Sequence, residues 1–193
     1  MGKGEETRLA VLDEAARVAR VVGLGGLTIG TLAERTALSK SGLFGHFKSK
    51  ESLQLQVLEH ARARFVDLVV RPALAAPRGE PRLRVLFDGW LRWQSAPGGC
   101  LFVTAAAEFH HQSGAVRDEV VRGERDMLDM VTTMFRAGVA DGAFRQDTDP
   151  DQAACEFNGV LLAFHQAFHL LEDERAESRA RRALDDLLAR VRT

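Results

Sequence analysis

The stretch LTIGTLAERTALSKSGLFGHFKSK, residues 27–50, decides the fold because it predicts two short helices joined by a tight turn. Thr28 can cap the first helix and Ser39 can cap the second, since both side chains accept hydrogen bonds from the free amides of a first helical turn. Ala37 and Leu38 would form the turn between them. Two short helices joined in this way are a helix-turn-helix.

The second of these helices keeps two glycines, Gly42 and Gly45, which each cost roughly 1 kcal/mol relative to alanine in a helix interior. Leu43 and Phe47 lie four residues apart, so they share one face and can anchor the helix. Glycine on the opposite face lets another molecule approach the backbone closely. A glycine-containing loop is the alternative, which the capping residues on both sides and the apolar spacing disfavour.

Composition describes an ordinary soluble globular chain of 193 residues, with 46% apolar and 27% charged residues. No apolar run approaches the roughly 18 residues that a membrane span needs, and the first residues form no signal peptide. Cys100 and Cys155 are far apart in sequence and do not suggest a disulfide framework. We therefore expect a cytoplasmic protein without a membrane partner.

Charge is spread unevenly along the chain, although the net charge is −1. Residues 1–65 carry 10 Lys and Arg against 7 Asp and Glu, and the remainder carries 16 against 20. All four lysines lie in the first 50 residues. A basic N-terminal part on an acidic body indicates a polyanionic partner for that part alone.

Periodicity along the rest of the chain predicts helices and no strands, so we expect an all-α fold of about nine helices. Gly23 should end the first helix, and APRGEP, residues 76–81, is the clearest break. Pro150 suits a first helical turn. The predicted helices cover residues 7–22 and 29–36, a third that Ser39 caps, a fourth that Ser49 caps and that runs until Pro72, and then residues 83–94, 102–111, 115–139, 150–171 and 176–192.

The helix-turn-helix itself indicates DNA as the polyanion. A recognition helix enters the major groove with its N-terminal end first, where side chains reach base edges. Polar side chains at other helix ends can donate to phosphates and fix register without reading sequence. The candidates for base contacts are Lys40, Ser41 and Gly42, and those for phosphate contacts are Thr28, His46 and Lys50.

Thr7-Arg8 and residues 27–53 together resemble the DNA-binding domain of TetR-family transcriptional repressors, in the anchors, the turn and the closing F-x-S/N-K. Phe44 stands where the family usually has tyrosine, so a hydroxyl-to-phosphate hydrogen bond is lost. Gly42 replaces a frequent threonine or serine. The DNA-binding residues that the resemblance implies are Thr28, Lys40, Ser41, Gly42, Phe44, His46 and Lys50.

The resemblance also implies a helix-turn-helix domain over residues 1–52 and a helical ligand-binding and dimerisation domain over residues 53–193. We expect a non-catalytic homodimeric repressor that a small apolar or aromatic molecule releases from a palindromic double-stranded operator. No cofactor and no metal are expected.

Aromatic, methionine and histidine residues in the C-terminal part have the composition of a ligand cavity, which is mostly apolar with a few polar groups. The alternative for each is ordinary core. The predicted ligand-binding residues are Trp90, Trp93, Phe102, Phe109, His110, Met127, Phe164, His165 and Phe168.

The helix that starts at Pro150 is apolar on more than one face, which predicts packing both inward and against another helix pair. The resemblance implies that this pair belongs to a second subunit. A buried central helix of a monomer is the alternative. The predicted interface residues are Phe157, Leu161, Leu184 and Leu187.

Three sharper chemistries remain as alternatives. Glu108 and His111 form one E-x-x-H, as in di-iron helical-bundle enzymes, but such a site needs a second copy that the sequence lacks. His165 and His169 lie one turn apart and could share a metal ion, although no third ligand is evident. Cys100 could be a redox sensor rather than a buried structural cysteine.

Overall fold

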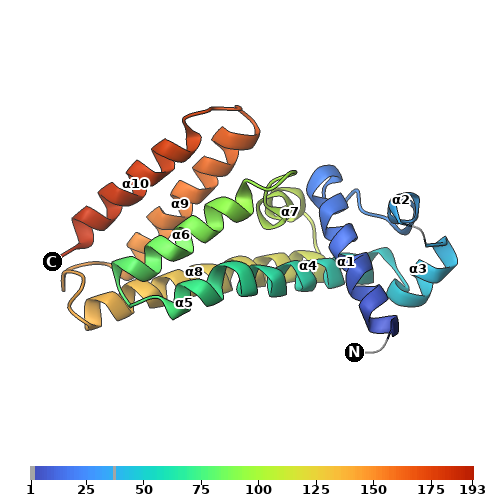
Figure 1. Ribbon diagram of the computed structural model, residues 1–193, viewed down its shortest axis with the longest axis horizontal. Helices are drawn as coiled ribbons and strands as arrows, with labels where there is room; N and C mark the ends of the chain where they lie inside the picture. Colours follow the sequence, from blue (N-terminus) through green and yellow to red (C-terminus); the bar gives the residue numbers. More distant parts are fainter. Residues whose placement is uncertain (1–2, 37) are drawn as a thin grey trace. The chain divides into compact units, whose positions relative to one another are not determined.

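The fold is given by a computed structural model that describes residues 3–36 and 38–193, without the side chain of Lys3. Ala37, which was assigned to the turn, lies outside the described residues. Figure 1 shows helices throughout the described part, where the one β-bridge joins Phe144 and Arg192. The helices are α1 (Lys3–Val22), α2 (Ile29–Arg35), α3 (Lys40–Phe47), α4 (Lys50–Phe65), the π-helical segment η1 (Val66–Val70), α5 (Arg71–Ala75), α6 (Glu80–Gln94), α7 (Leu101–Phe109), α8 (Ala115–Ala140), α9 (Pro150–His169) and α10 (Ala176–Val191).

Because α4, η1 and α5 follow one another without a break, the described residues form nine helical runs. The predicted all-α fold is confirmed. Within the described ranges, no helix is both long enough and apolar enough to cross a membrane.

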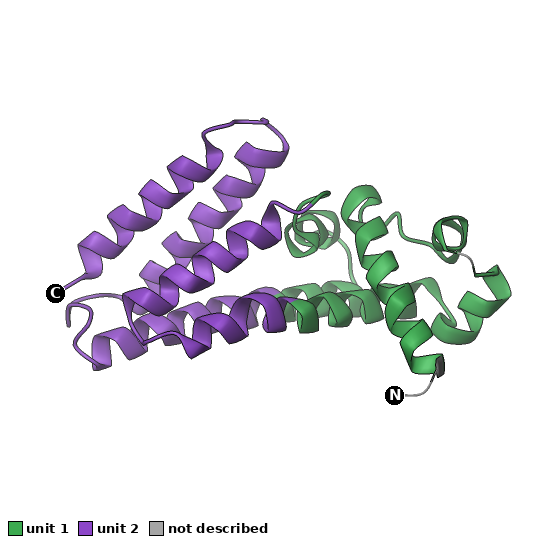
Figure 2. Ribbon diagram, viewed as in Figure 1, with its two compact units in different colours: residues 1–64, 97–123 green, residues 65–96, 124–193 purple. Residues whose placement is uncertain are grey.

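The chain divides into two compact units (Figure 2). Unit 1 comprises residues 1–64 and 97–123, and unit 2 comprises residues 65–96 and 124–193. Each unit is therefore built from two separate stretches of sequence. The division of function at residues 52 and 53 stays a prediction, since compactness alone does not locate activities.

Unit 1 buries a single apolar core beneath its short helices. Leu43 and Phe47 of α3 are both fully buried, and Leu38 packs partly buried against the same core. Leu43 and Phe47 therefore anchor α3 as their spacing predicted. Leu101, Ala105 and Phe109 bring α7 into the same core, which therefore draws on both stretches of the unit. The buried residues of this core are Val11, Leu12, Ala15, Val18, Ala19, Leu24, Leu27, Ile29, Leu32, Leu43, Phe47, Leu53, Val57, Leu58, Ala61, Leu101, Ala105, Phe109 and Val116.

Side chains cap the short helices of unit 1 at the predicted positions. Thr28 Oγ1 accepts from Thr31 N at 3.0 Å, and Thr28 N donates to Thr31 Oγ1 at 2.9 Å, which together make a capping box. Ser39 Oγ accepts from Gly42 N at 3.1 Å to start α3. Ser49 Oγ accepts the Ser52 amide at 3.0 Å, which caps the start of α4. These caps define where α2, α3 and α4 begin, because each satisfies an otherwise free amide.

Unit 2 is centred on an aromatic cluster. The ring of Phe157 lies with its centroid 5.6 Å from Phe87 and 6.4 Å from both Trp90 and Phe135. Phe157 is fully buried, so α6, α8 and α9 all contribute a ring to one core. Beside it, α9 and α10 pack against each other along their length (Figure 1).

The helical run 50–75 differs from its predicted end. We expected it to stop before Pro72, because proline lacks an amide and its ring presses on the carbonyl four residues earlier. The run instead continues to Ala75 by way of η1, where Arg71 N donates to Val66 O, five residues back. The wider π turn makes room for the proline ring, and the helix resumes as α5.

Candidate functional site

The N-terminal turn of α3 is open to solvent. Lys40, Ser41 and Gly42 are all exposed, while Leu43 and Phe47 hold the opposite face in the core. Ser41 Oγ lies 3.0 Å from the capping Ser39 Oγ. Helix α3 therefore presents a small, basic end that a nucleic acid could approach closely.

Two further α3 residues differ in their exposure. Phe44 is exposed over 53% of its surface, which is unusual for a side chain of this size. His46 is half-buried, with its ring centroid 6.1 Å from that of Phe47. An exposed phenyl ring beside Lys40 can lie against sugar or base surface, but it donates no hydrogen bond.

Lys50 and Thr28 approach the loop between α1 and α2. Lys50 Nζ donates to Gly25 O at 2.5 Å, and Gln54 Nε2 donates to Leu24 O at 2.8 Å. The Thr28 hydroxyl is occupied by its capping box with Thr31, so its own oxygen is already used as an acceptor. Two of the three predicted phosphate contacts, Lys50 and Thr28, thus lie at the edges of the same loop.

Glu108 of α7 holds that loop from its other side. Gly25 N donates to Glu108 Oε2 at 2.7 Å. Gly23 has a φ of +79°, which favours glycine, and a Cβ there would lie 2.1 Å from Glu108 Oε1, so any other residue would have to displace the carboxylate. The carboxylate that the E-x-x-H alternative required as an iron ligand is therefore engaged with the loop. Across the described ranges, no group of three His, Cys, Asp or Glu is placed to hold a metal ion.

Five of the predicted ligand-binding residues lie in unit 2 on α6 and α9. Trp90 and Trp93 each meet the ring of Phe65 edge-on, with centroids 5.2 and 5.4 Å apart. Phe164 stacks on Phe168 at 5.3 Å. Trp90 and Phe164 are buried, whereas Phe168 is 38% exposed, so this set mixes core residues with residues that a ligand could reach.

The fifth of them, His165, forms a histidine pair with His169, whose ring centroid is 5.0 Å away. Burial, and next the nearby His169, lower the pKa of His165. His169 Nε2 lies 2.6 Å from Gln94 O, which ties the end of α6 to the end of α9. A neutral imidazole of His165 can donate or accept a hydrogen bond at this junction.

The remaining predicted ligand-binding residues are placed differently. Met127 of α8 is half-buried in unit 2. Phe102 and Phe109 of α7 belong to unit 1, where Phe109 is 6% exposed and both pack against the core. His110 is exposed, and its Nδ1 lies 2.7 Å from Ala107 O. Phe109 and His110 thus have partners that do not require a ligand.

Sequence reasoning missed two polar groups of unit 2. Gln94 is 1% exposed, and its side-chain oxygen has no hydrogen-bond partner. Glu124 of α8 is half-buried, and burial raises its pKa. Both carried a signal in the sequence, because each is a polar residue at a position where the apolar period of its helix calls for an apolar one.

The four predicted interface residues are buried within one chain, and their place in a dimer interface stays a prediction. Phe157 and Leu161 are fully buried and Leu184 and Leu187 are 3% exposed within one chain, so they form the core between α9 and α10 and its neighbours. Phe157 and Leu161 offer no exposed surface, whereas Leu187 also lines a groove between α9 and α10. The helices were chosen from their apolar stripe, but that stripe is the inward one.

The outward side of the same two helices carries a groove of about 590 Å³. Its floor is made by small side chains, including Gly159, Ala163 and Ala183, of which Gly159 and Ala163 are exposed. Charged residues from both helices form its rim: Glu156, Arg179, Asp186 and Arg190. Small residues of this kind allow another helix to come close.

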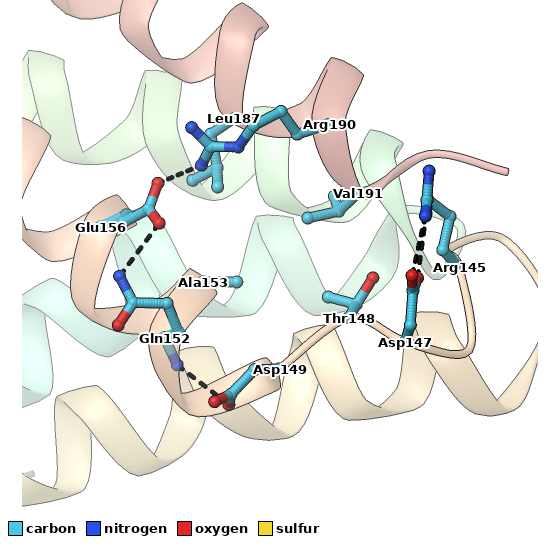
Figure 3. Close-up of a pocket in the computed structure, with 10 residues that line it drawn as sticks. All are labelled: Arg145, Asp147, Thr148, Asp149, Gln152, Ala153, Glu156, Leu187, Arg190 and Val191. Atoms are coloured by element: carbon cyan, nitrogen blue, oxygen red, sulfur yellow. Dashed lines mark hydrogen bonds and ion pairs between the residues drawn. The ribbon is translucent and has the colours of Figure 1, made fainter.

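A second hollow, of about 410 Å³, lies where α9 begins and α10 ends (Figure 3). Its charges are paired within the chain: Arg145 Nη2 lies 2.7 Å from Asp147 Oδ2, and Arg190 pairs with Glu156. Asp149 caps α9 through Asp151 N and Gln152 N. With these charges already balanced, the hollow offers little to a charged ligand.

Comparison with known proteins gives a consistent result over both units. Residues 11–57 match the family model described as "Bacterial regulatory proteins, tetR family", and residues 79–184 match the one described as "Tetracyclin repressor-like, C-terminal domain". No curated protein matches the chain in sequence.

Solved structures share the fold along nearly the whole chain. A TetR transcriptional regulator from Chloroflexus aurantiacus J-10-FL is 25% identical with a TM-score of 0.86, covering 100% of this chain and 99% of its own. AibR in complex with isovaleryl coenzyme A and operator DNA is 21% identical, with a TM-score of 0.73 and coverage of 95% and 97%. A transcriptional regulator from Saccharomonospora viridis in complex with choline is 18% identical, with a TM-score of 0.76 and coverage of 98% and 99%.

Proposed function

The chain belongs to the TetR family of bacterial regulatory proteins, and from this premise we propose that it is a homodimeric repressor that leaves a palindromic operator when a small molecule binds in unit 2. It is a transcriptional regulator of that family, whose members typically act by binding DNA. We assign it no catalytic activity and place its work in the cytoplasm, where bacterial DNA lies.

The observation that carries the DNA assignment is the exposed N-terminal turn of α3 on a buried anchor. Lys40 and Ser41 would contact base edges, and Gly42 would let the backbone approach them. Phe44 would pack against the wall of the DNA major groove without donating a hydrogen bond. Since α3 is held by fully buried side chains, its exposed end would enter the groove in one orientation.

Phosphate contacts would come from the residues around α3. Lys50 would exchange Gly25 O for a phosphate oxygen, since a charged hydrogen bond between two full charges is stronger than one to a neutral carbonyl. Thr28, just before the start of α2, and His46, near the end of α3, would contact phosphates on either side of the one that Lys50 binds. Such contacts supply affinity and register rather than sequence preference.

The second subunit would occupy the groove between α9 and α10. Its small floor residues would let the paired helices of a second copy approach closely, and Leu162 of α9 is 44% exposed in one chain. A palindromic operator follows from this arrangement, because two symmetry-related heads read two half-sites.

The effector would bind among the unit 2 aromatics on α6 and α9, with Met127 of α8 as a further candidate. AibR and the Saccharomonospora regulator each hold a small molecule, which supports ligand control in a protein of this fold. An inducer must bind the non-DNA conformation better; coupling of roughly 1–3 kcal/mol would lower operator affinity about 5- to 150-fold. Operator DNA must weaken ligand binding by the same factor.

Selection from a pool of random duplexes tests the proposal directly. The wild-type protein should enrich an inverted repeat, and Lys40→Ala should enrich a different sequence while Arg71→Ala, a change in unit 2, enriches the same one. Enrichment of no sequence by the wild type would contradict the assignment of α3 as a recognition helix.

A further inference from the structure

We propose that the effector is an uncharged, flat aromatic molecule with a hydroxyl or N–H group, and that this group donates a hydrogen bond to the side-chain oxygen of Gln94. The inference rests on the proposed function, because it specifies the polar end of the unit 2 effector site. It concerns a residue that sequence reasoning did not select.

Gln94 is the starting point because its amide is buried at the end of α6. The side chain is 1% exposed, and the oxygen Oε1 has no hydrogen-bond partner. Buried side-chain polar atoms are nearly always paired, since an unpaired one loses its hydration without a replacement. An unpaired acceptor retained at this cost is the feature expected of a group that pairs with a ligand.

The surroundings of Gln94 bring α6 and α9 to one place. His169 Nε2 contacts Gln94 O at 2.6 Å, and His165 lies beside His169 with ring centroids 5.0 Å apart. Phe168 meets the His169 ring edge-on at 4.9 Å. The backbone of Gln94 therefore lies next to a cluster of rings from α9.

Aromatic side chains of α6 extend this cluster away from Gln94. Trp90 lies one helical turn before Gln94 and therefore on the same face. Trp90 and Trp93 meet Phe65 edge-on, at 5.2 and 5.4 Å. Rings arranged edge-on offer both faces and edges to a further flat ring, which favours an aromatic ligand over a flexible chain.

The charge state of the cluster decides between acidic and neutral ligands. Burial lowers the pKa of His165, with His169 adding to the effect, so the imidazole is uncharged at neutral pH. An amide oxygen and a neutral imidazole do not balance a carboxylate, and an acceptor repels one. A hydroxyl or N–H group satisfies Gln94 Oε1 without bringing in a charge.

A matched pair of probes tests the hydrogen bond. 2-Naphthol and 2-methylnaphthalene have the same ring and nearly the same shape, but only the naphthol donates. Titration calorimetry or naphthol fluorescence should show the wild-type protein binding 2-naphthol about tenfold more tightly. Gln94→Leu should bind both probes equally, and Gln112→Leu, an exposed control in unit 1, should keep the preference.

Thermal unfolding without a ligand distinguishes a Gln94 oxygen that has no hydrogen-bond partner from one that is hydrogen-bonded to water. Leucine fills the space of glutamine, so Gln94→Leu should raise Tm by about 2–4 °C if the oxygen is unpaired. A fall in Tm means that the oxygen already has a partner and overturns the proposal. The proposal is also overturned if the wild type binds 2-naphthol and 2-methylnaphthalene equally well, or if Gln94→Leu still prefers 2-naphthol. Failure of the wild type to bind 2-naphthol up to its solubility limit overturns it as well.

Operator binding, measured on the same preparation, keeps this inference distinct from the proposed function. If the selected operator binds and the naphthol preference is absent, only the ligand class is wrong. If no operator is selected while the Gln94-dependent preference is present, the ring site stands and the repressor assignment fails.

Discussion

Lys50 and Glu108 bind the carbonyl and the amide of the same residue: Lys50 Nζ donates to Gly25 O at 2.5 Å, and Gly25 N donates to Glu108 Oε2 at 2.7 Å. A cation proposed to bind phosphate and a carboxylate of α7 therefore meet across a single peptide residue in unit 1. When a phosphate takes Lys50, the contact with Glu108 is left to fix the loop between α1 and α2.

Replacing Lys50 tests its proposed phosphate contact. Lys50→Ala should weaken binding to all DNA sequences, because a phosphate contact carries no sequence information, and the slope of log affinity against log salt should fall by about one. Mobility shifts over a salt series measure both. Arg71→Ala removes one positive charge from unit 2 and should leave the slope unchanged. Wild-type affinity in Lys50→Ala would remove Lys50 from the interface.

The fit of Gly23 against Glu108 predicts a coupling between the two positions. Gly23→Ala should cost about 1–2 kcal/mol of unfolding free energy from its left-handed backbone, and more from the displaced carboxylate. When Glu108 is also replaced by alanine, Gly23→Ala should cost only its backbone term. The losses of unfolding free energy from the two changes should therefore be less than additive, by roughly 0.5–3 kcal/mol. Urea unfolding of the single and double variants gives these values.

Gly142 supplies the control for that cycle. It has a similar φ of +74°, but a Cβ there would have nothing within 4 Å. Gly142→Ala should therefore show the backbone cost alone and be additive with Glu108→Ala. Additivity at Gly23 as well would mean that the carboxylate moves aside freely.

The proposed dimer predicts the effect of a charge in the groove. Ala163 is exposed in one chain, so Ala163→Arg should leave the fold and helical content of the subunit unchanged. The variant should nevertheless fail to dimerise, because the arginine side chain would fill the groove. Light scattering should report half the wild-type mass, and operator binding should be lost with it. Leu74→Arg, at a site that is 51% exposed outside the groove, should stay dimeric. A monomeric wild type at micromolar concentration would refute the proposal.

Core substitutions on the same helices should behave differently. Leu161→Glu and Leu184→Glu place a carboxylate where the side chain is 0% and 3% exposed. Burial of an unpaired charge in this core should unfold unit 2 rather than yield a folded monomer. Circular dichroism separates the two outcomes.

Glu124 gives a dependence of stability on pH. Because burial raises its pKa, the folded chain keeps the proton to higher pH than the unfolded chain does. Stability is therefore unaffected below the ordinary value of 4.5 and is lost as the pH rises from there through the raised pKa. Glu124→Gln should raise Tm by about 2–4 °C at pH 8 and by little at pH 4. Asp129→Asn, exposed on the same helix, should raise Tm at neither pH.

The fold followed from the sequence because its determinants are local. Thr28 and Ser39 cap the helices that they were predicted to cap, and Leu43 and Phe47 are spaced to share a buried face whatever lies beyond them. The predicted end at Pro72 failed for a related reason. A proline ends an α-helix by a clash with one carbonyl, and a single widened turn is enough to avoid it.

The site was less predictable because its features depend on pairs of residues from distant stretches. Phe157 looked like an outward residue on a helix with two apolar faces, and only the rings of α6 and α8 show which face is inward. The partner of Glu108 lies 83 residues earlier in the chain. The apolar period of α6 marks Gln94 as a polar exception, but it does not reveal that the side-chain oxygen of Gln94 is unpaired.

The widened turn at Val66–Val70 also has a consequence for the inheritance of this gene. A π turn contains about one residue more than an α-helical turn, so an in-frame deletion of a single codon there would restore an unbroken α-helix. That helix would then drive the ring of Pro72 into a backbone carbonyl. Loss of the extra residue should therefore destabilise the chain less when Pro72 has already been replaced.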